Sequence, residues 1–171
     1  MHGNGQDKSH RIMKVIQITL LFFVACSVKN ENQVEPILDD FIETYNSRED
    51  IERFLSFYDD HFVLEDIING DRVKGKEELR NFLDWDNPDI IILDSNYVII
   101  KEKIIDEKMV VIKGHYSGFK WRDRDFEAMH FTTILTFNES NKITKQVDWI
   151  NYPASLVNYE ERKNSNEWIE R

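Results

Sequence analysis

The chain has 171 residues, of which 41% are apolar and 32% are charged. This length allows one globular domain with a substantial core and leaves little room for a second. The formal net charge is −10 at pH 7, and no basic cluster interrupts the acidic composition. Such a surface repels phosphate backbones, so we expect no nucleic-acid partner.

Residues 1–25 are predicted to form a signal peptide. Basic residues come first, an apolar run from Val15 to Ala25 follows, and the only cysteine, Cys26, comes next. The run is too short for a bilayer-spanning helix, which takes about 20 residues, but it suits the hydrophobic region of a signal peptide. The segment "FVAC" resembles a bacterial lipobox, although Phe23 stands where leucine is preferred. The resemblance implies cleavage before Cys26 and attachment of lipid to its sulfur.

The N-terminal segment leaves two alternatives open, a cleaved secretory signal followed by a chance cysteine, or a short N-terminal anchor. Met13 is an alternative start of translation. Under the lipoprotein interpretation, lipidated Cys26 holds the protein at a membrane of the bacterial cell envelope, and residues 26–34 form a polar tether. Residues 35–171 then make up the folded domain, in which no internal disulfide forms because the chain has a single cysteine.

Two helices are predicted at the start of the domain. From Glu35 onward, apolar residues recur at helical spacing and share one face, namely Ile37, Leu38, Phe41 and Tyr45. Ser47 followed by Asp50 predicts the N-terminal cap of a second helix. The apolar residues of this second helix have the same spacing, namely Ile51, Phe54, Leu55 and Tyr58. Both stripes are typical of helices that pack on a core.

A short strand at residues 57–66 ends in an acidic side chain on its apolar face. Because alternate residues of a strand share a face, Phe62, Leu64 and Asp66 point the same way. If the two apolar residues lie in the core, the carboxyl group of Asp66 lies at the mouth of a pocket or has a chemical role. The segment "NGDRVKG" after this strand predicts a turn.

A third helix and a run of strands complete the domain. The helix is predicted at residues 76–83 and buries Leu79, Phe82 and Leu83. Short polar turns separate the strands, which favours an antiparallel meander. The predicted strands are 90–93, 97–105, 109–121, 126–137 and 142–152, and residues 153–168 form a final short helix or tail. Three helices on one face of such a sheet give an α+β domain.

The order of these elements resembles the SnoaL-like branch of the nuclear transport factor 2-like (NTF2-like) superfamily. The strongest local similarities are "FYDDHFVLED", "VKGKEELRNFL", "FNESNKI" and "VDWINYPASL", and the resemblance extends from Glu35 to about Tyr159. It implies a cone in which three N-terminal helices pack on a curved, mostly antiparallel sheet around an apolar pocket, often in homodimers. Members include polyketide cyclases, ketosteroid isomerases, limonene epoxide hydrolases and dehydratases.

Within this resemblance, Asp66 matches the acidic residue that serves as general base in ketosteroid isomerases. A carboxylate partly removed from water has a raised pKa and accepts a proton more readily. The isomerases also use a tyrosine and an aspartic acid that donate hydrogen bonds to the enolate. Here those positions fall near Phe41 or Ile42 and on Thr133. The absence of both donors argues against steroid isomerisation.

Five further polar residues are predicted contacts of a pocket ligand, namely Tyr45, Trp85, His115, Thr133 and Asp148. Structural roles are open for these candidates as well. Asp66 could end an exposed strand or cap the following turn, and the glycines around His115 indicate a bend or a close backbone approach. The large aromatic residues Trp85, Trp121, Trp149 and Tyr152 suit either a cavity wall or ordinary core packing. Alternation along strand 126–137 points His130 outward.

The sequence predicts no metal site and no cofactor, because metal-ligand spacings, phosphate loops and nucleophile motifs are missing. We therefore expect a membrane-tethered SnoaL-like domain that binds a small, mostly apolar molecule. Cofactor-free proton transfer of isomerase, cyclase or dehydratase type would occur at Asp66. The alternative is a non-enzymatic envelope adaptor that uses the outer sheet face around His130 for dimerisation or partner binding.

Overall fold

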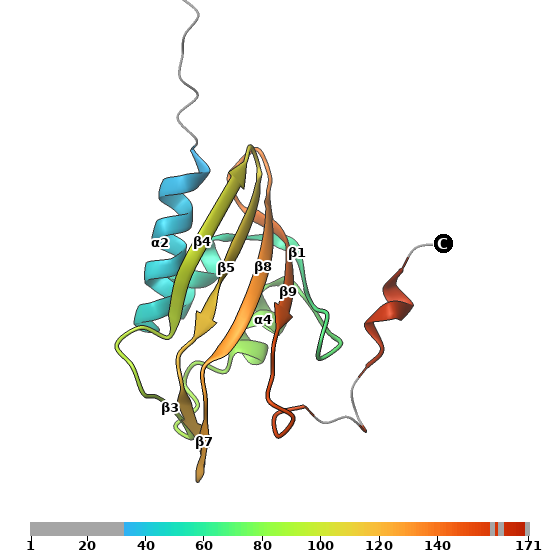
Figure 1. The fold of residues 1–171 in the computed structure, drawn as a ribbon. Helices are drawn as coiled ribbons and strands as arrows, with labels where there is room; N and C mark the ends of the chain where they lie inside the picture. Colours follow the sequence, from blue (N-terminus) through green and yellow to red (C-terminus); the bar gives the residue numbers. More distant parts are fainter. Residues whose placement is uncertain (1–32, 158–159, 161–162, 170–171) are drawn as a thin grey trace, which may run out of the picture. The chain divides into compact units, whose positions relative to one another are not determined.

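The computed structural model describes residues 33–157, 160 and 163–169 (Figure 1). The predicted signal peptide, Cys26 and most of the predicted tether lie outside these residues. No helix in the described ranges combines the length and the apolar character that a membrane span needs.

Helix α2 (Val34–Ser47) buries the stripe predicted from its spacing and ends at a residue with left-handed backbone geometry. Leu38 and Phe41 are buried, and Tyr45 is partly buried against the same core. At the C-terminal cap, Arg48 has φ 52°, and its N–H donates to the carbonyl oxygen of Thr44 at 3.3 Å. This cap turns the chain sharply and places the side chain of Arg48 at the end of the helix.

Helix α3 (Ile51–Ser56) is shorter than predicted, and its cap was assigned to the wrong residue. The Asp50 carboxylate accepts a hydrogen bond from the N–H of Arg53 at 2.9 Å, which is an N-cap interaction. Ser47 instead belongs to α2, where its hydroxyl donates to the carbonyl oxygen of Thr44. Tyr58, predicted on the helical stripe, is the first residue of strand β1.

Helix α4 (Gly75–Leu83) confirms the third predicted helix, with a correction to its buried face. Leu79 is fully buried, but 42% of Phe82 is exposed, so Phe82 is not a core residue. The carboxylate of Glu78 accepts a hydrogen bond from the N–H of Lys74 at 2.8 Å and closes the first turn. A short final 3-10 helix, η1 (Ser165–Trp168), stands where a helix or tail was predicted.

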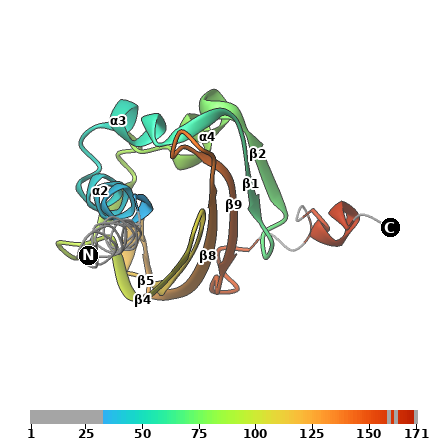
Figure 2. The ribbon, with the colours of Figure 1, turned by 90° about the horizontal axis from the view of Figure 1, so that it is seen from above.

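Six strands form one curved sheet in the order β2-β1-β9-β8-β5-β4. Strands β1 and β9 run parallel, and every other neighbouring pair is antiparallel. Figure 2 shows the sheet curling round the side on which the helices lie. The bounds are β1 (Tyr58–Asp66), β2 (Asp71–Lys74), β4 (Val98–Asp106), β5 (Met109–Tyr116), β8 (Met129–Phe137) and β9 (Ile143–Ile150). This arrangement confirms the predicted α+β class with a mostly antiparallel sheet.

Three short strands form a second sheet in the order β3-β6-β7, which the sequence did not predict as a separate unit. Their bounds are β3 (Ile90–Ile92), β6 (Phe119–Trp121) and β7 (Arg124–Phe126). The predicted strand 109–121 divides into β5 and β6 at Ser117 and Gly118. The predicted turn after β1 contains strand β2, which pairs with β1 in a hairpin.

The inner face of the large sheet and the helices enclose an apolar core. Along β1 and β8 the alternating inward residues are buried, including Phe62, Leu64, Phe131 and Leu135. The alternation also brings polar residues to this face, because Thr133, Asp148 and Asp66 are each less than 9% exposed. A buried polar group is costly unless it is hydrogen-bonded, so these three residues mark a candidate functional site.

Candidate functional site

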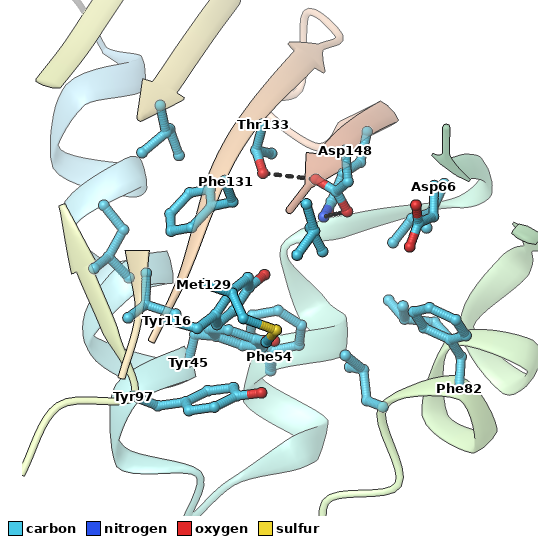
Figure 3. Close-up of a pocket in the computed structure, with 18 of the residues that line it drawn as sticks. Tyr45, Phe54, Asp66, Phe82, Tyr97, Tyr116, Met129, Phe131, Thr133 and Asp148 are labelled. Carbon is cyan, nitrogen blue, oxygen red and sulfur yellow. Dashed lines mark hydrogen bonds between the residues drawn. The ribbon is translucent and has the colours of Figure 1, made fainter. Parts of the chain in front are cut away.

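The inner face of the sheet and the helices enclose a cavity of about 370 Å³ (Figure 3). This volume lies within the roughly 300–1,000 Å³ range of small-molecule sites. Most of the lining is apolar or aromatic and comes from α2, α3, α4, β5 and β8, including Phe41, Phe54, Leu79, Ile112, Met129 and Phe131. The polar lining residues gather in two places, one around Asp66 and Asp148 and one around Arg48.

Asp66 lies at the end of β1 and lines the cavity although only 1% of its surface is exposed. One carboxylate oxygen, Oδ1, accepts hydrogen bonds from the N–H groups of Ile68 and Asn69 at 3.0 and 2.9 Å. The other, Oδ2, accepts a hydrogen bond from the hydroxyl of Tyr152 at 2.5 Å. Burial raises the pKa of Asp66, and the three donors oppose that rise by favouring the ionised form.

Asp148 lies beside Asp66 on the neighbouring parallel strand, where the two residues are register partners. Its Oδ1 accepts a hydrogen bond from the hydroxyl of Thr133 at 2.6 Å, shown dashed in Figure 3, and its Oδ2 accepts one from Nε2 of Gln146 at 2.8 Å. Burial raises the pKa of Asp148 to about 6, and the negative charge of Asp66 adds to that rise. Asp148 is therefore poised to gain or lose a proton near neutral pH.

The hydrogen bonds of Asp148 extend to a second buried hydroxyl. Tyr58 is 1% exposed, and its hydroxyl donates to Oε1 of Gln146 at 2.7 Å. Burial raises the pKa of Tyr58 well above its ordinary value, so the phenol stays protonated and remains a donor. The network Tyr58–Gln146–Asp148–Thr133 thus holds one carboxyl group in a fixed position at the cavity wall.

The predicted pocket residues fall into two groups in the structure. Asp66, Tyr45, Thr133 and Asp148 line the same cavity, whereas Trp85 and His115 do not. A role in ligand contact or catalysis for the four lining residues stays a prediction.

Trp85 and His115 lie outside the cavity lining for different reasons. The Trp85 ring packs behind the cavity wall, with its centroid 5.0 Å from that of Phe54 and 5.9 Å from that of Tyr45. His115 lies on the outer face of β5, opposite to the buried Gly114, and its ring is 6.4 Å from that of His130. The predicted outward direction of His130 agrees with its exposure.

Sequence reasoning did not assign three of the polar lining residues to the site, Gln146, Tyr152 and Arg48. Gln146 precedes Asp148 by two residues on the same strand, so strand alternation could have identified it. Tyr152 was noted only as an aromatic candidate, because its contact with Asp66 joins residues 86 positions apart. Nothing in the local sequence of Arg48 signals that its side chain lines a cavity.

The described residues contain no group of three or more His, Cys, Asp or Glu side chains arranged to hold a metal ion. The polar lining of the cavity consists of carboxyl, amide, phenol and hydroxyl groups and one guanidinium group. These groups can form hydrogen bonds to a polar atom of a ligand, and the carboxyl groups can donate or accept a proton.

Residues 38–146 match the family model of the SnoaL-like domain, which covers more than half of the chain. The chain belongs to the SnoaL-like family. Solved structures agree with the NTF2-like fold of this family. A protein from Shewanella putrefaciens CN-32, assigned as a SnoaL-like polyketide cyclase, is similar with a TM-score of 0.59 and 18% identity, over 70% of this chain and 90% of that chain.

Two further solved structures share this fold. A protein of ketosteroid isomerase-like fold from Catenulispora acidiphila DSM 44928, in complex with trimethylamine, has a TM-score of 0.56 and 18% identity, over 71% of this chain and 88% of that chain. An M. tuberculosis LEH-like epoxide hydrolase has a TM-score of 0.55 and 14% identity, over 68% of this chain and 81% of that chain. No curated protein matches the sequence significantly. At sequence identities this low, the similarity to these solved structures establishes the fold alone.

Proposed function

We propose that this SnoaL-like domain binds a small, mostly apolar molecule in its cavity and that the Asp66–Asp148 pair carries cofactor-free acid–base chemistry on it. The observation that supports this most directly is the pairing of two buried carboxyl groups on neighbouring strands at one end of a cavity whose lining is mostly apolar or aromatic. Core packing alone favours apolar side chains there, because burying a carboxyl group costs stability even where hydrogen bonds offset part of that cost. Buried ionisable groups with shifted pKa values in a cavity are typical of functional sites.

The two carboxyl groups have different surroundings, which suits them to different roles. Three donors hold Asp66 and favour its ionised form, so it suits the binding and orientation of a polar group of the ligand. Asp148 has two donors and a pKa of about 6, so it suits proton transfer near neutral pH. The relatives assigned as a polyketide cyclase and an epoxide hydrolase support chemistry of this kind, since both names denote enzymes of small molecules.

A fluorescent apolar probe tests the cavity. We expect N-phenyl-naphthylamine to bind with one-to-one stoichiometry and increased fluorescence, because its aromatic rings match the lining. Met129 is buried and lines the cavity, so Met129→Trp should fill part of the space and weaken probe binding by about 10-fold, the effect of roughly 1.4 kcal/mol. Met109→Trp is the matched control, since Met109 is 49% exposed and lies outside the cavity lining.

An equal loss of probe affinity in both methionine variants, or no binding to the wild type, would contradict the cavity function. For any substrate that the protein converts, Asp148→Asn should lower kcat by about 10²-fold or more, the usual contribution of a positioned acid or base. Asp66→Asn should lower kcat/KM for the same substrate, because Asp66 binds and orients its polar group. Full activity in both variants would remove the acid–base role and leave binding.

We also propose that the mature protein is attached to a membrane of the bacterial cell envelope through lipid on Cys26. The support is the order of basic residues, apolar run and cysteine in the sequence. Metabolic labelling with a fatty acid should label the wild type and leave Cys26→Ala unlabelled. Labelling of both proteins to the same extent would show that Cys26 is not the attachment site.

A dimer through the outer face of the sheet is the proposed assembly, and an adaptor role on that face is the alternative function. The observation in favour is a set of exposed apolar side chains on the outer face, in which Ile104, Met109 and Trp149 are 52%, 49% and 40% exposed. Apolar groups gathered on one face are typical of protein contacts. Sedimentation equilibrium measures whether the domain associates with itself.

A further inference from the structure

The second polar part of the cavity lining centres on Arg48, at the C-terminal end of α2. Arg48 is the cationic residue among the described residues that line the cavity, and Tyr45, Tyr97 and Tyr116 accompany it there. Figure 3 shows the labelled tyrosines Tyr45 and Tyr97 well away from Asp66. The cavity therefore has an acidic end and a separate end with one positive charge and several phenol hydroxyls.

Arg48 forms no ion pair with an acidic side chain of the described residues. Within the described ranges, ion pairs join Arg53, Arg72, Arg80 and Arg122 to carboxylates, whereas no ion pair of Arg48 is present. Among the described residues its side chain makes one hydrogen bond, a long one from Nη2 to the carbonyl oxygen of Trp85 at 3.4 Å. A guanidinium group has five N–H donors, so most of the donors of Arg48 are available to another molecule.

The position of this guanidinium group is fixed from two sides. Its central carbon lies 5.3 Å from the centre of the Trp85 ring and 5.4 Å from that of Tyr97, which are cation–π distances. The backbone of Arg48 is held by its hydrogen bond to Thr44 in the helix cap. A charge held in this way needs little reorganisation on binding, which favours affinity and specificity for a ligand of matching charge.

We propose that Arg48 forms an anion subsite and that the ligand of the cavity is a small organic acid. Its anionic oxygen would bind Arg48, its apolar body would fill the aromatic space, and its reacting or donor group would meet Asp66 and Asp148. The reverse orientation brings the anion against two carboxyl groups, which is unfavourable. This inference rests on the proposed cavity function and adds the chemical class of the ligand.

Two related probes distinguish the contribution of the ligand's negative charge to binding from the contribution of its apolar body. Anilinonaphthalene sulfonate carries the same aromatic framework as N-phenyl-naphthylamine and adds one anionic group. A hydrogen bond to a charged group is strong when it is shielded from water, so Arg48→Met should weaken binding of the sulfonate by about 10-fold or more. The same variant should change the affinity for the neutral probe by less than about 2-fold, since the shape of the cavity is kept.

Two control variants complete the experiment. Arg53→Met removes the same charge outside the cavity lining and should leave both probe affinities unchanged. Arg48→Lys keeps the positive charge and should retain part of the affinity for the sulfonate. Binding of the neutral probe also shows that each variant is folded.

The possible outcomes separate the two proposals. Suppose that the neutral probe binds the wild type. If Arg48→Met then weakens the binding of both probes equally, or weakens the binding of neither probe, the anion subsite is wrong and the cavity function stands. An equal loss of sulfonate binding in Arg53→Met would also contradict the subsite, because the effect would then come from net charge. If neither probe binds the wild type, the cavity function and the subsite are both wrong.

Discussion

Gly114→Ala should lower the free energy of unfolding by about 3 kcal/mol. A Cβ atom at position 114 would lie 2.2 Å from the carbonyl oxygen of Ile99 and 3.2 Å from the Cα of Ile100. Both contacts are with the backbone of β4, the edge strand that pairs with β5, so no side chain can rotate to relieve them. Overpacking typically costs about 1–3 kcal/mol, and contact between two backbones places this variant at the upper end.

The change should be visible in both heat and denaturant unfolding. For a domain of this size, about 3 kcal/mol corresponds to a decrease of roughly 10 °C in Tm. Gly118→Ala is a matched control, because its Cβ would lie 3.1 Å from the carbonyl oxygen of Phe126 and should cost only about 1 kcal/mol. A loss in Gly114→Ala no larger than that of the control would show that the β4–β5 pair moves apart readily.

The same glycine shows what the sequence could and could not predict about the fold. The glycines around His115 predicted a bend or a close backbone approach, and the structure has the close approach at Gly114. Long β-branched runs predicted β4, β5, β8 and β9 of the large sheet, because alternation over eight or nine residues is a strong signal. The short strand β2 was predicted as a turn. The division of strand 109–121 at Ser117 was not predictable, since it depends on pairing with β3 and β7.

For the candidate site, too, the sequence predicted residues whose direction depends on local pattern and missed residues whose position depends on distant contacts. Asp66 was identified because strand alternation with Phe62 and Leu64 fixed its direction. Arg48 and Tyr152 were not, because their positions depend on a helix cap and on a contact between distant residues. Trp85 was misplaced since it follows α4 in an irregular segment, where no periodicity fixes which way a side chain points.

Asp148→Asn should stabilise the domain at neutral pH by up to about 3 kcal/mol. The pKa of Asp148 rises from 3.8 to about 6, chiefly because burial disfavours the charged form. Each unit of difference between the folded and unfolded pKa is worth about 1.4 kcal/mol. Asparagine carries no charge to bury, and it can accept a hydrogen bond from Gln146 and donate one to the hydroxyl of Thr133.

The gain should depend on pH with a definite sign. Below about pH 4 the carboxyl group is protonated in the folded and unfolded states, so its ionisation costs nothing. Between about pH 4 and 6 the unfolded chain loses this proton while the folded domain keeps it, and the wild type loses stability as the pH rises. Above about pH 6 both states are ionised and the cost is constant. The difference between variant and wild type should therefore grow from pH 4 to 6 and then level off.

Denaturant unfolding of both proteins at several pH values measures this difference, with Asp106→Asn as control. Asp106 is exposed at the end of β4, so the same loss of charge there should change stability by less than about 0.5 kcal/mol. If Asp148→Asn is less stable than the wild type at every pH, the prediction is wrong. The ionised carboxylate would then stabilise the fold as a hydrogen-bond acceptor, and its burial would not reduce stability. If the variant is more stable at neutral pH, the wild type keeps at its cavity wall an acid that weakens the fold, as expected for a group retained for chemistry on a ligand.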